Sequence, residues 1–317
     1  MNMSNIGVAG EARFVVLRAD GTVKSDTGYQ KNLILNQGLE YFGGGIGGDI
    51  NEKCVIGAGN SAPAVTQTTL DSFIAIATGT DTTKDYSYTD TGDGLYKIWE
   101  QRKYRFTGLG NVNISEAGLA SKGSTSSDYY LTTRVLIKDE LGAPTSMGLK
   151  LGETLDIYYK LYKVIDTTDK SFVVNVSDGQ DIPTLTPYNV VIRPALVGTS
   201  NHRVSGGIKT VPYVKIGTDD LEAITSEPVV NNSEGMMTAE TYVVGSHKCK
   251  LVVNFGLNNS NVAIRTLSPT YAGYVFNLFP FQMRLGRVSD DAPLTKTNKD
   301  TLAIPLEVSW RRFEGEL

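Results

Sequence analysis

Histidine and cysteine are the scarcest reactive side chains in this sequence of 317 residues, with two of each. Cys54 and Cys249 lie far apart, whereas secreted disulfide scaffolds use many closely spaced cysteines. Two buried free thiols are therefore the favoured interpretation, and a disulfide between them is the alternative. His202 and His247 fall in polar turn segments, where we expect exposed side chains and no general base. The pair His247 and Cys249 also lacks the further ligands that zinc needs.

Long apolar runs, a signal peptide and a basic stripe are missing as well. No apolar run approaches the roughly 18 residues that a membrane span needs, and residues 1–10 lack a basic start and an apolar centre. Basic residues form only short clusters, at 102–105 and 311–312, in a chain of net charge −4. A protein that grips the DNA backbone usually carries a basic stripe. We therefore expect synthesis in a cytoplasm, no membrane span and no direct sequence-specific contact with nucleic acid.

Motifs for phosphate, acyl and calcium chemistry are also absent. The glycine-rich stretch at residues 43–48 lacks the Lys and Ser/Thr of a P-loop and the flanking elements of a dinucleotide fingerprint. No G-x-S-x-G nucleophile elbow occurs. The acidic residues within 81–94 do not follow the register of a calcium loop, which leaves only a loosely bound cation as an alternative.

Glycoside cleavage needs two carboxylates beside aromatic platforms. Glu100 next to Trp99 and Glu314 near Trp310 supply the residue types, but the sequence gives no sign that they converge. The short repeated coils of a β-helix depolymerase are also missing. The sequence therefore assigns no catalytic, cofactor-binding or metal-binding residue. It predicts a protein that is not an enzyme, with a glycan hydrolase as a minor alternative.

What the chain does have is 33 glycines against 11 prolines, which indicates many turns, and segments whose apolar residues alternate. Such alternation is typical of strands with one buried face. In 154–162 it places Leu155, Ile157, Tyr159 and Leu161 on one face, and Asp156 and Lys160 on the other, solvent-facing side. The sequence therefore predicts an all-β, mainly antiparallel fold with little helix. The expected strands are 11–19, 53–58, 97–106, 131–138, 154–162, 172–176, 189–197, 211–216, 241–245, 248–256 and 301–310.

Several local predictions accompany these strands. Asp20-Gly21 favours a hairpin turn after the first strand, and Asn36 could cap one or two helical turns. Residues 68–77 fit either a short helix or a strand, and 78–94 read as a long polar loop. Pro305 cannot donate to a sheet ladder, which places its strand at an edge or a bulge.

The length favours two domains. We place them at 1–165 and 166–317, each a β-sandwich-like unit with long loops. A weak internal echo supports the division, because Ala143-Pro144 and Ala292-Pro293 each precede a Thr-Leu strand. Each would be the closing hairpin of its domain, although chance explains the echo equally well.

Two stretches, and two segments upstream of the first, carry a resemblance to known proteins. The stretches are "YRFTGLGNVNISEAGLAS" followed by "DYYLTTRVLIKDELGAPTSMGLKLGETLDIYYKLY", and the C-terminal "PLTKTNKDTLAIPLEVSWRR". The upstream segments are "NLILNQGLEYF" and "CVIGAGNSAPAVTQTTLDSF". This pattern resembles tail-associated virion structural proteins of tailed bacteriophages, and it covers about half of the chain. Its elements are a Gly-x-Gly-Asn turn before a Thr-x-Leu element, an I-S-E-x-G-L element, and a Thr-Arg strand.

The resemblance implies a structural subunit of a phage tail, such as a sheath, collar, tail-surrounding ring or fibre-attachment protein. Its expected partners are further copies of itself in a homo-oligomeric ring and other tail or portal-vertex proteins, and its expected location is the virion. A head decoration protein or a receptor-binding fibre protein is the alternative. Tyrosines on strand faces, such as Tyr158 and Tyr162, are candidate interface residues, although ordinary sheet-surface tyrosines are the simpler interpretation for each.

Overall fold

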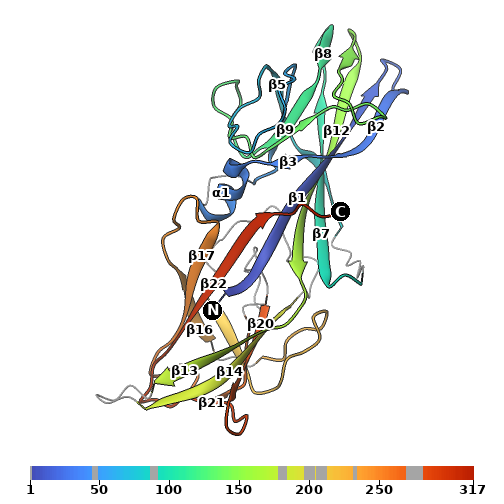
Figure 1. Ribbon diagram of the computed structural model, residues 1–317. Helices are drawn as coiled ribbons and strands as arrows, with labels where there is room; N and C mark the ends of the chain where they lie inside the picture. The colour runs from blue at the N-terminus through green and yellow to red at the C-terminus, as the bar shows by residue number, and fades with distance from the viewer. Residues whose placement is uncertain are drawn as a thin grey trace.

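The computed structural model describes residues 2–44, 49–85, 92–177, 184–195, 204, 213–230, 234–268 and 281–317. Within these ranges it contains strands and one short helix, and most strand pairs are antiparallel. The all-β prediction is therefore confirmed. Figure 1 shows an elongated molecule in which the longest strands run along its length.

Thirteen strands form one sheet. Their order is β13 (Lys170–Ser177), β14 (Leu185–Pro194), β20 (Phe281–Arg287), β19 (Thr266–Ser268), β15 (Tyr213–Gly217), β16 (Glu234–Ala239), β17 (Lys248–Phe255), β22 (Leu302–Arg312), β1 (Asn2–Leu17), β12 (Thr154–Asp166), β7 (Leu95–Phe106) and β6 (Thr80–Asp85), and β2 (Val23–Lys31) also pairs with β1.

A second sheet and the helix cover one end of this large sheet (Figure 1). The second sheet has the order β3 (Leu33–Ile34), β10 (Thr133–Leu136), β9 (Glu116–Ala120), β4 (Lys53–Gly57) and β5 (Phe73–Thr78). The helix is α1 (Asn36–Gly44), and two short ladders pair β8 (Val112–Ile114) with β11 (Met147–Leu149) and β18 (Ala263–Ile264) with β21 (Leu294–Thr295).

Strand β1 takes part in both main hydrophobic cores. Its even-numbered side chains share one face, along which Ile6 and Val8 lie in the larger core and Phe14 and Val16 lie in the second one. The larger core also contains Trp310, which is almost completely buried. The second core fills the space between the large and the five-stranded sheets. One strand therefore joins the packing of the whole molecule.

Most of the expected strands and the hairpin are confirmed. Gly21 has a φ of 83°, and the amide of Arg18 donates to the carbonyl of Thr22 at 2.8 Å, which closes the turn between β1 and β2. Burial in β17 and β22 alternates as the sequence predicts. The helix begins at Asn36, as expected.

Two local predictions need correction. The segment 241–245 forms no strand, and the neighbouring strand is β16 instead. The supposed polar loop at 78–94 begins with β6, while its residues 86–91 lie outside the described ranges.

Two other predictions left alternatives open, and the structure selects one in each case. The stretch 68–77 contributes a strand, β5. The strand that holds Pro305 is not at a sheet edge, because β22 lies between β17 and β1, but its ladder with β1 starts only at Glu307 and has a register shift there.

The two long strands that follow the Ala-Pro turns do not close hairpins. Strand β12 pairs with β1 and β7, and β22 pairs with β1 and β17. Each Ala-Pro turn leads instead into a short strand, β11 or β21, before the long one. Strands on both sides of residue 165 share the large sheet, and the division into domains 1–165 and 166–317 stays a prediction.

Gly38 offers a direct test of how α1 sits on the second sheet. A Cβ at this position would lie 2.1 Å from the carbonyl oxygen of Thr132, which is backbone and cannot move aside easily. We expect Gly38→Ala to lower the free energy of unfolding by about 1–3 kcal/mol through overpacking, although Ala favours a helix by about 1 kcal/mol. The matched Gly256→Ala, whose nearest neighbouring atom is 3.9 Å away, should change it by less than about 0.5 kcal/mol. Chemical denaturation of both variants measures the difference, and equal stability would contradict the packing described.

Candidate functional site

The three motifs of the phage-like pattern meet at one buried ionic cluster. Glu116 comes from the I-S-E-x-G-L element on β9, and Arg134 comes from the Thr-Arg strand β10. Both side chains are completely buried. The third motif, the turn and loop at residues 58–72, wraps around them. We call this cluster the loop anchor.

Arg134 spreads its donors over the loop. Its Nε donates to Glu116 Oε2 at 2.9 Å, its Nη2 donates to Asp71 Oδ2 at 2.7 Å, and its Nη1 donates to Gln67 Oε1 at 2.8 Å. A guanidinium suits this task because its five donors lie in one rigid plane. The loop is therefore tied to β10 at two positions through one side chain.

Glu116 holds the loop through backbone amides. Its Oε1 accepts hydrogen bonds from the amides of Gly59 and Ser72, both at 2.9 Å. A Cβ on Gly57 or Gly59 would lie 2.5 or 2.4 Å from the same oxygen, so the Gly-x-Gly of the motif leaves room for the carboxylate. Because both charges are paired and bonded internally, the loop anchor has a structural role and offers no reactive group.

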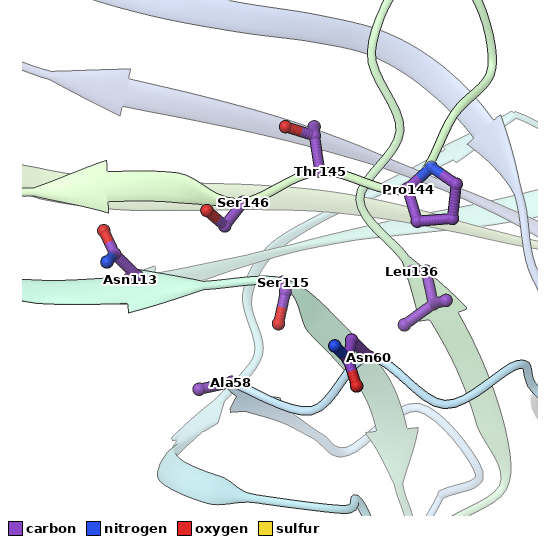
Figure 2. A pocket seen from close by; sticks show the side chains of 8 residues that line it. All are labelled: Ala58, Asn60, Asn113, Ser115, Leu136, Pro144, Thr145 and Ser146. Atoms are coloured by element: carbon purple, nitrogen blue, oxygen red, sulfur yellow. The ribbon is translucent and has the colours of Figure 1, made fainter.

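A shallow groove lies beside the anchored loop. Figure 2 shows Asn60 and Ala58 of the loop with Asn113 and Ser115 along one side, across from the segment 144–146. Its volume is about 540 Å³. Its lining consists of Ala58, Asn60, Asn113, Ser115, Leu136, Pro144, Thr145 and Ser146. None of these side chains can act as an acid or a base near neutral pH, so the groove suits binding through amides and hydroxyls and not proton transfer.

A second feature is the outer face of β2, β1, β12 and β7, opposite the buried side chains of these strands. In the sheet register Arg13 lies opposite Tyr29 on β2 and opposite Tyr158 on β12, and Tyr158 lies opposite Lys103 on β7. The guanidinium carbon of Arg13 is 5.7 Å from the Tyr158 ring centroid. We call this surface the aromatic–cationic face.

Lys160 occupies the middle of the aromatic–cationic face. Its Nζ lies 4.1 Å from the ring centroid of Tyr29 and 4.6 Å from that of Trp99. Cation–π contacts of this kind contribute about 0.5–1 kcal/mol each when partly exposed. Cations and rings are interleaved over four neighbouring strands, and the tyrosine, tryptophan and arginine among them are residue types enriched at protein interfaces.

Carboxylates balance several of these cations. Arg13 pairs with Asp26, and Asp156 accepts from Arg105 Nη2 at 2.6 Å and lies 3.1 Å from Lys103 Nζ. Burial alone would raise the pKa of Asp156, but the hydrogen bonds from Arg105 and Lys103 outweigh it and hold the pKa below its ordinary value. The sequence placed Asp156 on the solvent side, whereas only 2% of its side chain is exposed.

Lys163 is buried on the inner face of β12. Its ammonium lies 5.8 Å from the ring centroid of Phe42 in α1. Burial lowers its pKa to about 7, and the nearby charge of Glu100 offsets only part of that effect. Glu100 in turn accepts from Asn51 Nδ2 and from Arg102 Nε, both at 3.2 Å. The sequence marked Glu100 only as a candidate carboxylate for glycan cleavage, and it did not mark Lys163, because a lysine within a strand normally reads as exposed.

Neither carboxylate considered for glycan cleavage shares an environment with the tryptophan near it in the sequence. Trp99 lies on the outer face, while Glu100 is buried on the inner one. Trp310 is buried, and its Nε1 donates to the carbonyl of Leu39 at 2.7 Å, whereas Glu314 is exposed. The arrangement expected of a glycosidase is not formed by either pair.

The histidines and cysteines can be placed as follows. His202 lies outside the described residues. His247 is in a turn, but only 25% of its side chain is exposed and its Nε2 lies 3.0 Å from Glu40 Oε1, so the expected exposure is wrong. Cys54 and Cys249 are buried free thiols, as the favoured interpretation held.

No group of three or more His, Cys, Asp or Glu side chains in the described ranges could hold a metal ion. No helix in these ranges is long and apolar enough to cross a membrane.

Of the tyrosines singled out, Tyr158 lies half-buried on the aromatic–cationic face, while Tyr162 is buried and donates to Glu11 Oε2 at 2.8 Å. No protein-family model, curated protein or solved structure matches the chain.

The loop anchor predicts a large difference between two arginines. Arg134→Met would leave the buried Glu116 carboxylate without its cation, so we expect a loss of about 3–5 kcal/mol in the free energy of unfolding. The control Arg13→Met removes a pair whose side chains are 38% and 31% exposed, and it should cost at most about 1 kcal/mol. Denaturant titration of both variants measures this, and similar losses would refute the anchor.

Lys163 predicts a rise of stability with pH. Its folded pKa of about 7 lies below the unfolded value near 10.4, so the folded state binds fewer protons between these values and gains stability as the pH increases. We expect the free energy of unfolding to rise by about 1 kcal/mol from pH 7 to pH 8. Lys163→Met should flatten this slope, as measured by urea titration at both pH values. The window ends at pH 8 because burial raises the pKa of the Cys54 thiol, which works in the opposite direction above that pH. A wild-type slope that survives in Lys163→Met would rule out Lys163 as its source.

Proposed function

We propose that the chain is a non-enzymatic structural subunit of a bacteriophage tail, which assembles with copies of itself into a ring within the virion. The observation that carries the proposal is the aromatic–cationic face. It presents Tyr29, Trp99 and Tyr158 beside Arg13 and Lys160 on one sheet surface.

This composition suits a protein partner better than a nucleic acid. Tryptophan, tyrosine and arginine are the residues that contribute most to interface energies. Arg13, Arg105 and Lys103 already have carboxylate partners, so little unbalanced positive charge remains for a phosphate backbone. The rings are held by their neighbours, so docking would order few side chains.

The loop anchor supports the same assignment through the resemblance. The Gly-x-Gly-Asn loop, the I-S-E-x-G-L element and the Thr-Arg strand are separate in the sequence, yet their charged residues belong to one cluster. Because these residues form one structural cluster, the occurrence of the three motifs together in the pattern has a physical cause. Other tail or portal-vertex proteins are the further partners that we propose.

The groove in Figure 2 favours a second candidate, a receptor-binding fibre protein. Its uncharged amides and hydroxyls could bind the hydroxyl groups of a cell-surface glycan. The two candidates differ in a simple experiment. A receptor binder should adsorb to host cells as the purified chain, and a tail subunit should not.

Assembly should depend on the aromatic–cationic face. We expect the double variant Tyr29→Ala/Lys160→Ala to lose ring formation, seen by negative-stain microscopy, because it removes the ring and the cation at the centre of the face. The control Val244→Ala/Lys299→Ala changes exposed residues outside that face and should assemble normally. Antibodies against the purified chain should also label tailed particles released by the strain that carries the gene. Unlabelled particles together with a monomeric chain would refute the proposed function.

A further inference from the structure

Four strands of five or more residues have a hydrogen-bonded neighbour on one side only within the described ranges: β2, β5, β6 and β13. A bare strand edge is a template for pairing with another chain, and proteins commonly blunt it with charges, prolines or bulges. The four edges differ in this respect.

Two of the edges are blunted. Strand β2 contains Lys24, Asp26 and Lys31, and its ladder with β1 has two register shifts. Strand β6 contains two aspartates and a lysine, and its ladder with β7 is also shifted. Neither edge is suited to continue a sheet into a second molecule.

The edge of β13 has no neighbouring strand within the described residues. All eight residues pair with β14 without a register shift, and no proline interrupts the strand. Its one charge, Lys170, is at the first position and is paired with Asp166 at 2.5 Å. Val173 is 65% exposed, and the other outward side chains, Ser171, Asn175 and Ser177, are small and uncharged. A regular edge of this length, with its one charge paired at one end, promotes association.

The edge of β5 has the same character. The strand reads FIAIAT, without charge or proline, and it pairs only with β4. Its single register shift is confined to the first pair, Gly57 with Phe73. Five of its six side chains are half-buried. They pack against the second core or a smaller cluster beside it, while the backbone edge away from β4 has no hydrogen-bonded strand in the described ranges. Figure 1 places β5 and β13 near opposite ends of the elongated molecule.

We propose that β13 of one copy pairs with β5 of the next copy, so that the sheets continue from subunit to subunit. Two different surfaces that fit each other give a head-to-tail contact, which closes into a ring or extends as a filament, whereas a self-complementary patch stops at a dimer. No charge on β5 opposes the approach of β13, and the blunted edges of β2 and β6 leave few competing partners. Backbone hydrogen bonds would supply the contact, as in other strand additions. This inference rests on the proposed self-assembly and adds an edge contact to the one that we propose through the aromatic–cationic face.

The test blocks one strand edge at a time with a charged side chain. Val173→Lys places a charge on β13, and Ala77→Lys places one on β5, where the long side chain can reach solvent from a half-buried position. Sedimentation velocity should show larger species for the wild-type chain and monomers for each variant. The controls Val244→Lys and Ala223→Lys put the same charge on exposed loop residues and should behave as the wild type. Circular dichroism confirms that each variant keeps its β-sheet spectrum.

Mixing the two variants gives the decisive result. Each retains one intact edge, so an equimolar mixture should form a dimer and nothing larger. A mixture that stays monomeric would overturn the pairing, and so would a dimer of Ala77→Lys alone, which would mean that β13 pairs with itself. Assembly that depends on both edges in a chain absent from phage particles would support this contact and refute the proposed function. Phage particles labelled by the antibodies, together with edge variants that assemble as the wild type does, would support the proposed function and refute this contact.

Discussion

The structure depends on the length of β1 and on its pairing with two other long strands. At about 3.3 Å per residue, its sixteen residues extend for roughly 50 Å. It pairs with β12 over twelve residues and with β22 at its other flank, so it connects strands from both halves of the chain. Because its inward side chains enter both cores, neither core can be rearranged without a shift of this strand. A one-residue slip would turn its apolar side chains outward along the whole length.

The buried charges have different effects from the charges on the surface. Arg134 and Glu116 are costly to bury, and well-packed apolar residues of the same volume could give equal stability. Their advantage is geometric, since one carboxylate and one guanidinium fix a loop of fifteen residues (58–72) that has little regular structure. The arginine on the outer face does something else, because Arg13 lies over rings and keeps part of its side chain in water. The same residue type thus organises a loop in one place and a surface in the other.

The parts of the fold that could be predicted from the sequence are those in which one face of a strand is buried. Strand β17 is an example, because Cys249, Leu251, Val253 and Phe255 all enter the core. The segment 241–245 has an equally apolar composition, yet Gly245 adopts a φ of 81° and Tyr242 stacks on Trp310 at 5.7 Å instead of pairing in a sheet. Tertiary contacts decide such cases, and strand propensity does not.

The candidate site was less accessible to prediction, for a related reason. Arg134 and Glu116 lie on neighbouring strands in buried positions, but in the sequence they are single polar residues within short strands. The aromatic–cationic face depends on register across β2, β1, β12 and β7, which alternation within any one strand does not specify. Alternation assigned Lys160 to the solvent side correctly. It could not show that Tyr29 and Trp99 would be on either side of it.

A layer of ionic groups separates the two cores on the inner face of the large sheet. Leu161 belongs to the larger core and Tyr159 to the second one, and their partners on β7 are Glu100 and Arg102. Arg102 also bonds to Asp49 at 2.8 Å, which fixes the segment after α1 against the sheet. If both cores were purely apolar, a shift of the second sheet by one residue pair along the large sheet would cost little free energy. An ionic layer between them makes such a slip expensive, because it would leave Glu100 or Arg102 buried against apolar side chains. We therefore interpret this layer as the element that sets the position of the second sheet on the first. The fold is less stable for it than it would be with an apolar layer in the same place.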